Sequence, residues 1–314
     1  MSLCLCGDRV LSPLTRAVSY RAVGLALAAG AVLLFSIRPI LIKLAYGYAR
    51  DPVTLIALRM VFSLPFFVFA AWWARDRVGN VPIARKDGLA IAGLGFLGYY
   101  LASFFDFLGL QYISAGLGRL VLFLYPTIVV ALSWFVLRKP AGRRELAALA
   151  VTYVGLAIVL ARAVEGQHEN LVLGAAFVFG GAAAYAIYLV AGTEVIRRVG
   201  SVRFTALALS WASLAVIVQF LLLRPWSALD LPWQVFALTM VMAVGCTVAP
   251  TFMTAEALKR VGANDTAIVG ALGPVSTVAL GWLGLDERMT GPQILGALLV
   301  LAGVLMVSIR PSRR

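Results

Sequence analysis

The feature that most constrains this chain is a series of apolar segments, each about 20 residues long, separated by short stretches that hold most of the charged residues. A helix that crosses a bilayer core about 30 Å thick needs about 20 apolar residues. Charged residues make up only 13% of the 314 residues, whereas soluble domains carry about 25%. The pattern therefore predicts an all-α, polytopic membrane protein. We expect ten transmembrane helices, at about 22–45, 53–74, 88–108, 113–137, 144–162, 171–193, 203–223, 233–255, 264–284 and 291–309.

Basic residues gather on one side of the expected bilayer. The net charge is +13, but the arginines and lysines punctuate the apolar segments and form no stripe of the kind that binds nucleic acid. If the N-terminus is cytoplasmic, the loops on that side hold 19 basic residues and the opposite loops hold four. Because cytoplasmic loops retain arginine and lysine, we expect both termini in the cytoplasm, with 1–21 as a cytoplasmic tail. The excess of arginine over lysine favours a bacterial inner membrane.

The sequence offers little enzymatic chemistry. Its single histidine, His168, lies in an expected loop, and the chain carries neither a P-loop nor a G-x-S-x-G motif. The three cysteines, Cys4, Cys6 and Cys246, match no disulfide framework or metal site. We therefore expect no enzyme, no cofactor and no metal. The expected partners are a small-molecule substrate and the lipid bilayer, with no nucleic acid, and the sequence leaves the oligomeric state open.

The two halves of the chain resemble each other. A shift of 148 residues brings "LFLYPTIVVALSWFVL", at 122–137, onto "GALGPVSTVALGWLGL", at 270–285, with seven identities in sixteen positions. A repeat of five helices has an odd number of crossings, so its second copy enters the bilayer from the opposite side. This predicts two inverted five-helix repeats, at 22–162 and 171–309. In transporters of this kind the binding site lies between the halves.

Several phrases resemble EamA-like domains of the drug/metabolite transporter superfamily. They are "DPVTLIALRMVFSLPFF", "LSWFVLRKPAGRRELAALAVTYVGLAIVL" and above all "ALKRVGANDTAIVGALGPVSTVALGWLGLDERMTGPQILGALLVLAGVLMV". The resemblance runs from Arg21 to Arg310, and "GLDERMT" looks like the short acidic turn of that family, which "RKP" replaces in the first half. It implies a ten-helix secondary transporter, commonly an exporter of amino acids or other small metabolites, and leaves the substrate unidentified.

Four ionisable residues lie within apolar segments of the first half. They are Arg38, Arg59, Asp106 and Arg119, from four expected helices and at similar depths. An arginine at the centre of a membrane helix costs about 2.5 to 3.5 kcal/mol, so each needs an offset. Substrate binding is one explanation; snorkelling, bonds to helix carbonyls or neutralisation by Asp106 are the structural alternative. Because the 148-residue shift places these arginines over apolar neighbourhoods, the shared scaffold does not need them.

Polar side chains recur on one side of two other helices. Tyr99, Ser103 and Asp106 have i, i+4, i+7 spacing, as do Thr247, Thr251 and Thr254. The threonines could instead bond their own helix backbone, and tyrosines could be core or interfacial anchors. The predicted substrate-binding residues are Ser36, Arg38, Tyr99, Ser103, Asp106, Arg119, Tyr185, Tyr188, Thr247 and Thr251.

Prolines and carboxylates complete the predicted site. We expect Pro39, Pro126, Pro250 and Pro274 to act as hinges or kinks. Asp106 and Glu256 are the candidates for proton coupling, although both could simply pair with bases. The sequence thus favours an alternating-access carrier that moves a small metabolite, such as an amino acid, out of the cell. A channel-like facilitator and a non-transporting receptor or assembly protein remain open as alternatives.

Overall fold

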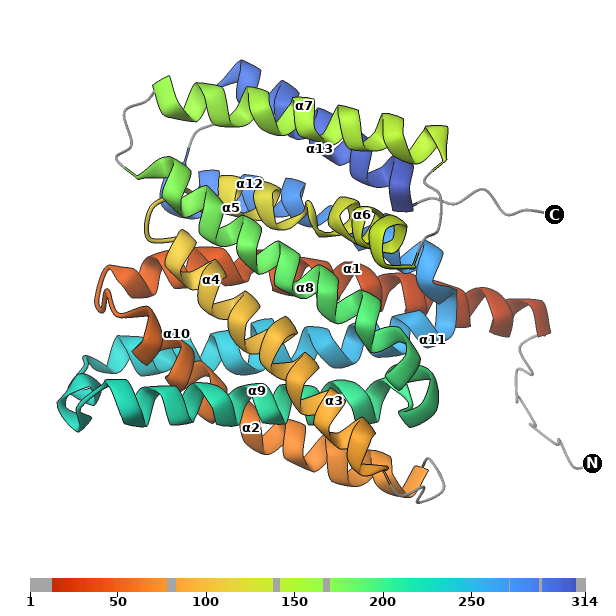
Figure 1. The fold of residues 1–314 in the computed structure, drawn as a ribbon, viewed down its shortest axis with the longest axis vertical. Coiled ribbons are helices and arrows are strands. Elements are labelled where there is room, and N and C mark those ends of the chain that lie inside the picture. Colours follow the sequence, from red (N-terminus) through yellow and green to blue (C-terminus); the bar gives the residue numbers. More distant parts are fainter. Residues whose placement is uncertain are drawn as a thin grey trace, which may run out of the picture.

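The computed structural model describes residues 13–77, 83–137, 142–165, 170–270, 272–287 and 290–308, and over these residues it contains helices and no strand. Figure 1 shows the helices packed lengthwise into one bundle. Their bounds are α1 (Pro13–Tyr46), α2 (Pro52–Arg77), α3 (Arg85–Gly95), η1 (Phe96–Leu101), α4 (Ala102–Gly109), α5 (Ala115–Leu122), α6 (Tyr125–Leu137), α7 (Arg143–Glu165), α8 (Leu171–Val199), α9 (Ser201–Leu223), η2 (Trp226–Leu229), α10 (Trp233–Ala243), η3 (Val244–Val248), α11 (Ala249–Gly270), α12 (Leu272–Leu285) and α13 (Gly291–Ser308).

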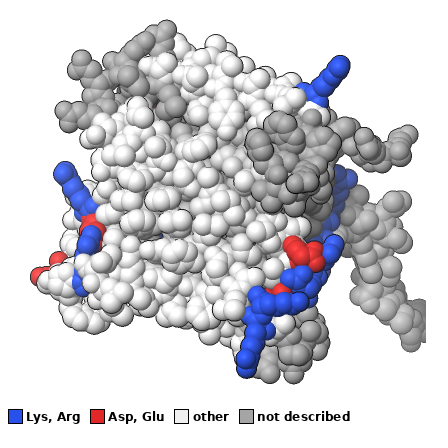
Figure 2. Space-filling view, in the orientation of Figure 1, with Lys and Arg blue, Asp and Glu red and all other residues white. Residues whose placement is uncertain are grey.

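The helices have the length and composition of membrane spans. Within the described residues, seven are long and apolar enough to cross a bilayer, and Leu146–Val159, Leu272–Leu285 and Gly291–Met306 are shorter apolar helices. The seven are Tyr20–Tyr46, Pro52–Ala74, Arg85–Gly109, Ala115–Leu132, Leu171–Val199, Ser201–Leu223 and Trp233–Val261. Figure 2 shows charged side chains near opposite edges of the viewed face, with a broad uncharged band between them. The chain is a multi-pass membrane protein.

Some helices differ from the expected segments. The helix expected at 264–284 is divided, because α11 continues to Gly270 and α12 begins at Leu272. The segment expected at 113–137 is likewise divided, into α5 and α6. Helix α1 begins at Pro13, within the expected tail, while residues 1–12 and the loop residue His168 lie outside the described residues. Hydrophobicity alone does not reveal a break in a helix of this kind, because the residues on both sides of the break are equally apolar.

Helices from the first half (α1–α7) pack against helices of the second half (α8–α13) in reciprocal pairs. Helix α1 packs against α11 and α4 packs against α8; α2 packs against α9, and α7 against α13. Helix α1 also packs against α12, and α6 against α8. The two halves therefore interleave along the bundle and do not form separate domains.

Glycines allow α7 and α13 to approach closely. A methyl group at Gly155 would lie 2.6 Å from the carbonyl oxygen of Gly296, and one at Gly296 would lie 2.6 Å from that of Gly155. A methyl group at Gly303 would likewise collide with Thr152. Small residues permit such backbone contact between membrane helices, so these glycines set the distance between α7 and α13.

Helix boundaries repeat at the spacing found in the sequence. Helix α3 begins at Arg85 and α10 at Trp233, 148 residues later. Each is followed by a π-helix, η1 from Phe96 and η3 from Val244, again 148 residues apart. Helices α5 and α11 end at Leu122 and Gly270, at the same spacing. π-Helices are rare and often occur at functional sites, so their equivalent positions direct attention to this part of the bundle.

The α7–α13 contact gives a direct test of the packing. Gly296→Ala should lower the free energy of unfolding by about 1 to 3 kcal/mol, because the added methyl group overpacks the contact. Gly93→Ala is the matched control, since Gly93 is exposed and a methyl group there meets nothing within 4 Å. Thermal melting of the purified variants in one detergent measures both. Equal melting temperatures for the two variants would contradict the close contact.

Candidate functional site

A cavity of about 660 Å³ lies between the two halves. It is lined by α1, α2, η1, α4, α5, α8, α9, η3 and α11, together with Tyr125 and Pro126 of α6 and Val304 of α13. Apolar residues such as Phe35, Phe67 and Phe252 form much of its wall. Its polar lining residues are Arg38, Arg59, Tyr99, Ser103, Asp106, Arg119, Tyr125, Tyr185, Ser201, Thr205, Thr247, Thr251, Thr254 and Thr266. Mostly apolar walls with a few convergent polar groups are typical of small-molecule sites.

An ion pair joins α1 to α4 at the cavity wall. Nη2 of Arg38 donates a hydrogen bond to Oδ2 of Asp106 at 2.7 Å, and the side chains are 16% and 5% exposed. This is the pairing that the sequence leaves open as the structural alternative for Arg38. The carboxylate therefore offsets one buried guanidinium, and the burial of the pair makes each partner costly to remove alone.

Arg59 and Arg119 bring two further guanidinium groups to the same cavity. Arg59 is 1% exposed, and its Cζ lies 5.1 Å from the centroid of the Phe107 ring. Both arginines interact electrostatically with Arg38 and Asp106. Among the residues that the structure describes, no hydrogen-bond acceptor meets Nε or Nη2 of Arg59, or Nε of Arg119. The four ionisable residues expected at similar depths thus share one cavity, with three guanidinium groups and one carboxylate.

The two π-helices place residues at equivalent positions in the cavity lining. Tyr99 lies in η1 and Thr247 in η3, and both line the cavity. The Thr247 hydroxyl donates to the Met242 carbonyl at 2.9 Å, a bond to the residue five positions earlier. Pro250 follows η3 and has no N–H to continue the regular ladder, which accounts for the wider turn there. In η1 the backbone of Gly98 lies against the Tyr188 ring, where a methyl group would come within 2.3 Å of Cγ.

Aromatic side chains form one side of the cavity. Tyr185 packs against Tyr125 with ring centroids 5.1 Å apart and against Tyr188 at 5.7 Å. Tyr188 was expected to line the site but lies outside the lining, 3% exposed. Its hydroxyl donates to the Tyr99 hydroxyl at 3.2 Å. Tyr188 thus supports the wall from behind, because Gly98 of η1 covers its ring.

Ser36 also lies outside the lining of the cavity. Its hydroxyl is completely buried and contacts the carbonyls of Val32, at 2.7 Å, and Gly273, at 3.1 Å. The Thr277 hydroxyl of α12 approaches the Ser36 carbonyl at 3.4 Å. Ser36 therefore joins α1 to α12. Sequence spacing placed it near Arg38 without revealing that α12 covers this side of α1.

The remaining predicted residues fall into two groups. The Thr251 hydroxyl lines the cavity and donates to the Thr247 carbonyl at 2.6 Å, so its oxygen can still accept a hydrogen bond. Glu256 lies outside the lining and forms an ion pair with Arg260 at 2.8 Å. Pro126 and Pro274 lie in the first turns of α6 and α12, after the divisions of the fourth and ninth expected segments. Pro39 lies inside the continuous α1.

The polar lining includes six residues that were not among the predicted contacts: Arg59, Tyr125, Ser201, Thr205, Thr254 and Thr266. Snorkelling or bonding to helix carbonyls was the structural alternative for Arg59, because its position in the sequence did not reveal that it lies against Phe107 at the cavity. Tyr125 immediately precedes Pro126, which both halves share, and this shared motif could have pointed to Tyr125 as a lining residue. No sequence pattern pointed to Thr205, and the packing of α9 against η1 is what places it in the lining.

The cavity extends toward one end of the bundle. Ser201, at the start of α9, and Thr266, in the last turns of α11, line it there. In Figure 1 the α8–α9 turn and the N-terminal end of α1 lie on the right, whereas the α1–α2 and α9–α10 connections lie on the left. The cavity therefore extends toward the right-hand end of that view.

Polar contacts join the two halves at the opposite end. Arg224 donates from Nε and Nη2 to the two carboxylate oxygens of Asp51, each at 2.8 Å. Burial raises the pKa of Asp51, but hydrogen bonds from Arg224 and Thr54 lower it by more, so the net pKa lies below the ordinary value. Glu287 accepts bonds from the backbone N–H groups of Ala115 and Gly116, at 3.0 and 3.3 Å. The Asp51–Arg224 contribution is present at neutral pH and is lost as the pH falls through the lowered pKa of Asp51.

Comparison with known families identifies the chain. The profile of the EamA-like transporter family matches it twice, at residues 22–161 and 172–309. The chain belongs to this family. The EamA-like chain is similar to the uncharacterized transporter YcbK of Bacillus subtilis, with 28% identity over 83% of this chain and 85% of the relative. It is also similar to the uncharacterized inner membrane transporter YicL of Salmonella typhimurium, with 24% identity over 83% of this chain and 86% of the relative.

A protein of known crystal structure supports the fold of this EamA-like chain. It aligns with a TM-score of 0.59 and 20% identity over 91% of this chain and 96% of its own. The likeness concerns the fold alone. The family and its relatives point to a transporter rather than an enzyme.

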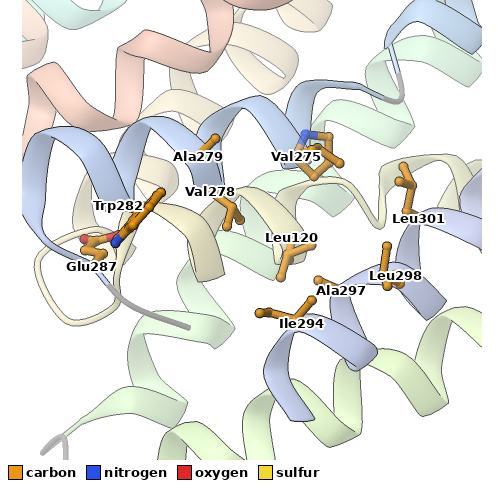
Figure 3. A pocket seen from close by; sticks show the side chains of 11 residues that line it. Leu120, Val275, Val278, Ala279, Trp282, Glu287, Ile294, Ala297, Leu298 and Leu301 are labelled. Carbon is orange, nitrogen blue, oxygen red and sulfur yellow. The ribbon is translucent and has the colours of Figure 1, made fainter. Parts of the chain in front are cut away.

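A second pocket, of about 600 Å³, lies on the flank of this EamA-like transporter. Figure 3 shows apolar side chains of α12 and α13 and Leu120 of α5 around it, with Glu287 near Trp282. The Glu287 carboxylate already accepts the two backbone bonds of α5. Trp282 and Leu298 are more than half exposed, as expected for a surface that faces lipid. The cavity between the halves is therefore the better candidate site.

The Arg38–Asp106 pair predicts an asymmetric response to substitution. Asp106→Asn should lower the free energy of unfolding by about 3 kcal/mol or more, because it leaves three guanidinium groups without a carboxylate. Arg38→Gln should cost less, since Asp106 keeps Arg59 and Arg119 as neighbouring cations. The double variant should melt above Asp106→Asn. Thermal melting of the three purified variants measures this, and additive losses would show that the pair contributes no coupling.

Proposed function

We propose that this protein is a secondary transporter that moves a small metabolite, such as an amino acid, by alternating access, and that it acts as an exporter. The main observation that supports this proposal is that equivalent positions of both halves line one cavity. Tyr99, Ser103 and Asp106 line one side, and Thr247, Thr251 and Thr254 line another, each 148 residues later. A site between two related halves is what alternating exposure requires.

The proposed architecture is ten membrane helices in two inverted repeats, at 22–162 and 171–309. Three observations support it. Helix boundaries and both π-helices recur 148 residues apart. Packing is reciprocal, since α1 contacts α11 as α4 contacts α8. The family profile matches twice, at 22–161 and 172–309.

The proposed orientation places both termini in the cytoplasm of a bacterial cell. The distribution of 19 basic residues against four supports this direction. With it, the end lined by Ser201 and Thr266 faces the cytoplasm, and the Asp51–Arg224 and Glu287 contacts close the outer end. The described conformation is then inward-facing, the state in which an exporter loads its substrate.

The proposed substrate contacts are the predicted residues that line the cavity. Arg38 and Arg119 supply cationic donors, Tyr99 and Tyr185 supply aromatic surface, and the hydroxyl groups of Ser103, Thr247 and Thr251 accept or donate hydrogen bonds. Asp106 remains the candidate for proton coupling because it is the carboxylate at the wall. Glu256 is a weaker candidate, since it lies outside the lining and pairs with Arg260.

Counterflow tests the transport function. Proteoliposomes preloaded with a substrate should take up the labelled compound transiently against its gradient, because a carrier exchanges bound molecules across the membrane. A panel of amino acids, organic acids, nucleobases and organic cations would be screened. Simple equilibration without overshoot would indicate a channel-like facilitator, and no flux for any compound would favour a receptor or assembly role. A lower cellular content of the compound on overexpression would support export.

Thiol labelling tests the orientation. In a variant without native cysteines, Ser227→Cys should react with an impermeant reagent from outside intact cells, and Ala84→Cys should not. Both positions are exposed and lie in or next to helix ends, so they form a matched pair. Permeabilised cells provide the control, in which both should react. Labelling of Ala84→Cys alone in intact cells would reverse the orientation.

A further inference from the structure

The charges in the cavity are unbalanced. Of the described lining residues, three are arginines and one is an aspartate. Asp106 forms an ion pair with Arg38, so Arg59 and Arg119 are left with no carboxylate at hydrogen-bond distance in the described chain. Two buried cations without counter-charges are unfavourable in a low-dielectric environment. A structure that retains them has a reason beyond packing.

The geometry of Arg59 indicates what would bind it. Its unpartnered Nε and Nη2 carry the two parallel N–H bonds on one edge of the guanidinium. The same edge of Arg224 binds the Asp51 carboxylate through two bonds of 2.8 Å. The Arg224–Asp51 pair therefore shows, within this chain, the two-bond contact with a carboxylate that Arg59 lacks.

Arg119 reaches toward the other half of the protein. A methyl group on Gly273 of α12 would lie 3.7 Å from its Nη2, an ordinary contact distance, so the guanidinium lies beside α12 of the second half. Its Nε is buried without an acceptor in the described residues. Arg119 is therefore also a donor group held beside the cavity.

The scaffold itself does not require these charges. The positions 148 residues after Arg59 and Arg119 are Leu207 and Ala267, and the position after Asp106 is Thr254. One half builds the same helices with uncharged residues. The positive charge is thus an addition to the first half and points to a ligand.

We propose that the cavity binds a small organic dianion, such as a dicarboxylate or a phosphate monoester, and that Arg59 and Arg119 neutralise it. This rests on the proposed transport function and replaces the example of an amino acid with an anionic substrate class. Two negative charges match the two arginines that the Arg38–Asp106 pair leaves uncompensated. A zwitterion or a cation would leave the imbalance in place. The anion reaches Arg59 once its side chain turns from the Phe107 ring toward the cavity.

Melting of the purified protein with matched compounds tests the charge requirement. At constant ionic strength, succinate and glycerol phosphate should each raise the melting temperature and saturate, because a ligand that binds only the folded state stabilises it. Succinamide, glycerol and 1,4-diaminobutane should not. Stabilisation by only one of the two anions would show whether the site binds dicarboxylates or phosphate monoesters. Equal or greater stabilisation by the diamine would overturn the proposal.

Arginine variants test the residues. Arg59→Met and Arg119→Met should each weaken anion affinity by roughly ten-fold to a hundred-fold, the loss of charge-assisted bonds. The ligand-free variants should melt at or above the temperature of the parent, because an uncompensated buried charge is removed. Arg197→Met is the matched control, at an exposed ion pair with Glu194 and outside the lining. A lower melting temperature with unchanged anion affinity would mean that these arginines are structural.

The two proposals fail in different ways. Counterflow of a cation or an uncharged solute, without anion flux, would leave the carrier function and remove the dianion site. Saturable anion binding that depends on Arg59, without flux of any compound, would keep the site and remove the carrier function.

Discussion

The bilayer offers a buried charge no solvent, so the ion pair between Arg38 and Asp106 is the interaction on which the cavity depends. It joins α1 to α4 at 2.7 Å, with both side chains largely buried. Arg59 and Arg119 interact with both members of the pair. Without the carboxylate, three guanidinium groups would face one another around one space. The Asp106 carboxylate on α4 therefore sets the net charge that the rest of the cavity wall must accommodate.

The same scarcity of water restricts where the backbone can be irregular. Within a membrane, broken helices are tolerated only where they face protein or a cavity. Here η1 and η3 contribute to the cavity lining, and the division between α5 and α6 lies beside Phe123 and Pro126, which also line it. Each irregular segment thus contributes to the cavity, although Phe96 of η1 and Val244 of η3 are exposed at the surface. Irregular backbone is concentrated where side chains must project toward a shared space.

The sequence predicted the apolar segments, the family and the 148-residue relation, because hydrophobic length and repeated motifs are local properties. It also placed most of the polar lining, since residues at i, i+4 and i+7 share one side of a helix. It could not say which neighbour covers that side. Ser36 is covered by α12 and Tyr188 by η1, so both lie behind the wall. Arg59 shows the converse, because its enclosure by Phe107 depends on packing between α2 and α4. The π-helix η1 likewise involves a contact between helices, with Gly98 on Tyr188, whereas Pro250 after η3 is visible in the sequence.

The scaffold is nearly symmetric, whereas its charge is not. Equivalent π-helices and helix ends recur in both halves, yet Arg38, Arg59, Asp106 and Arg119 all belong to the first. In the proposed alternating-access cycle, the halves move relative to each other. The ion pair in the cavity then stays within one half and need not break. The cavity contacts that change are weaker, such as those with the threonine hydroxyls of the second half, whereas the Asp51–Arg224 pair between the halves must separate when the closed end opens. A charged site of this kind can change its exposure without the cost of separating buried ions, which is a physical reason for confining the charges to one half.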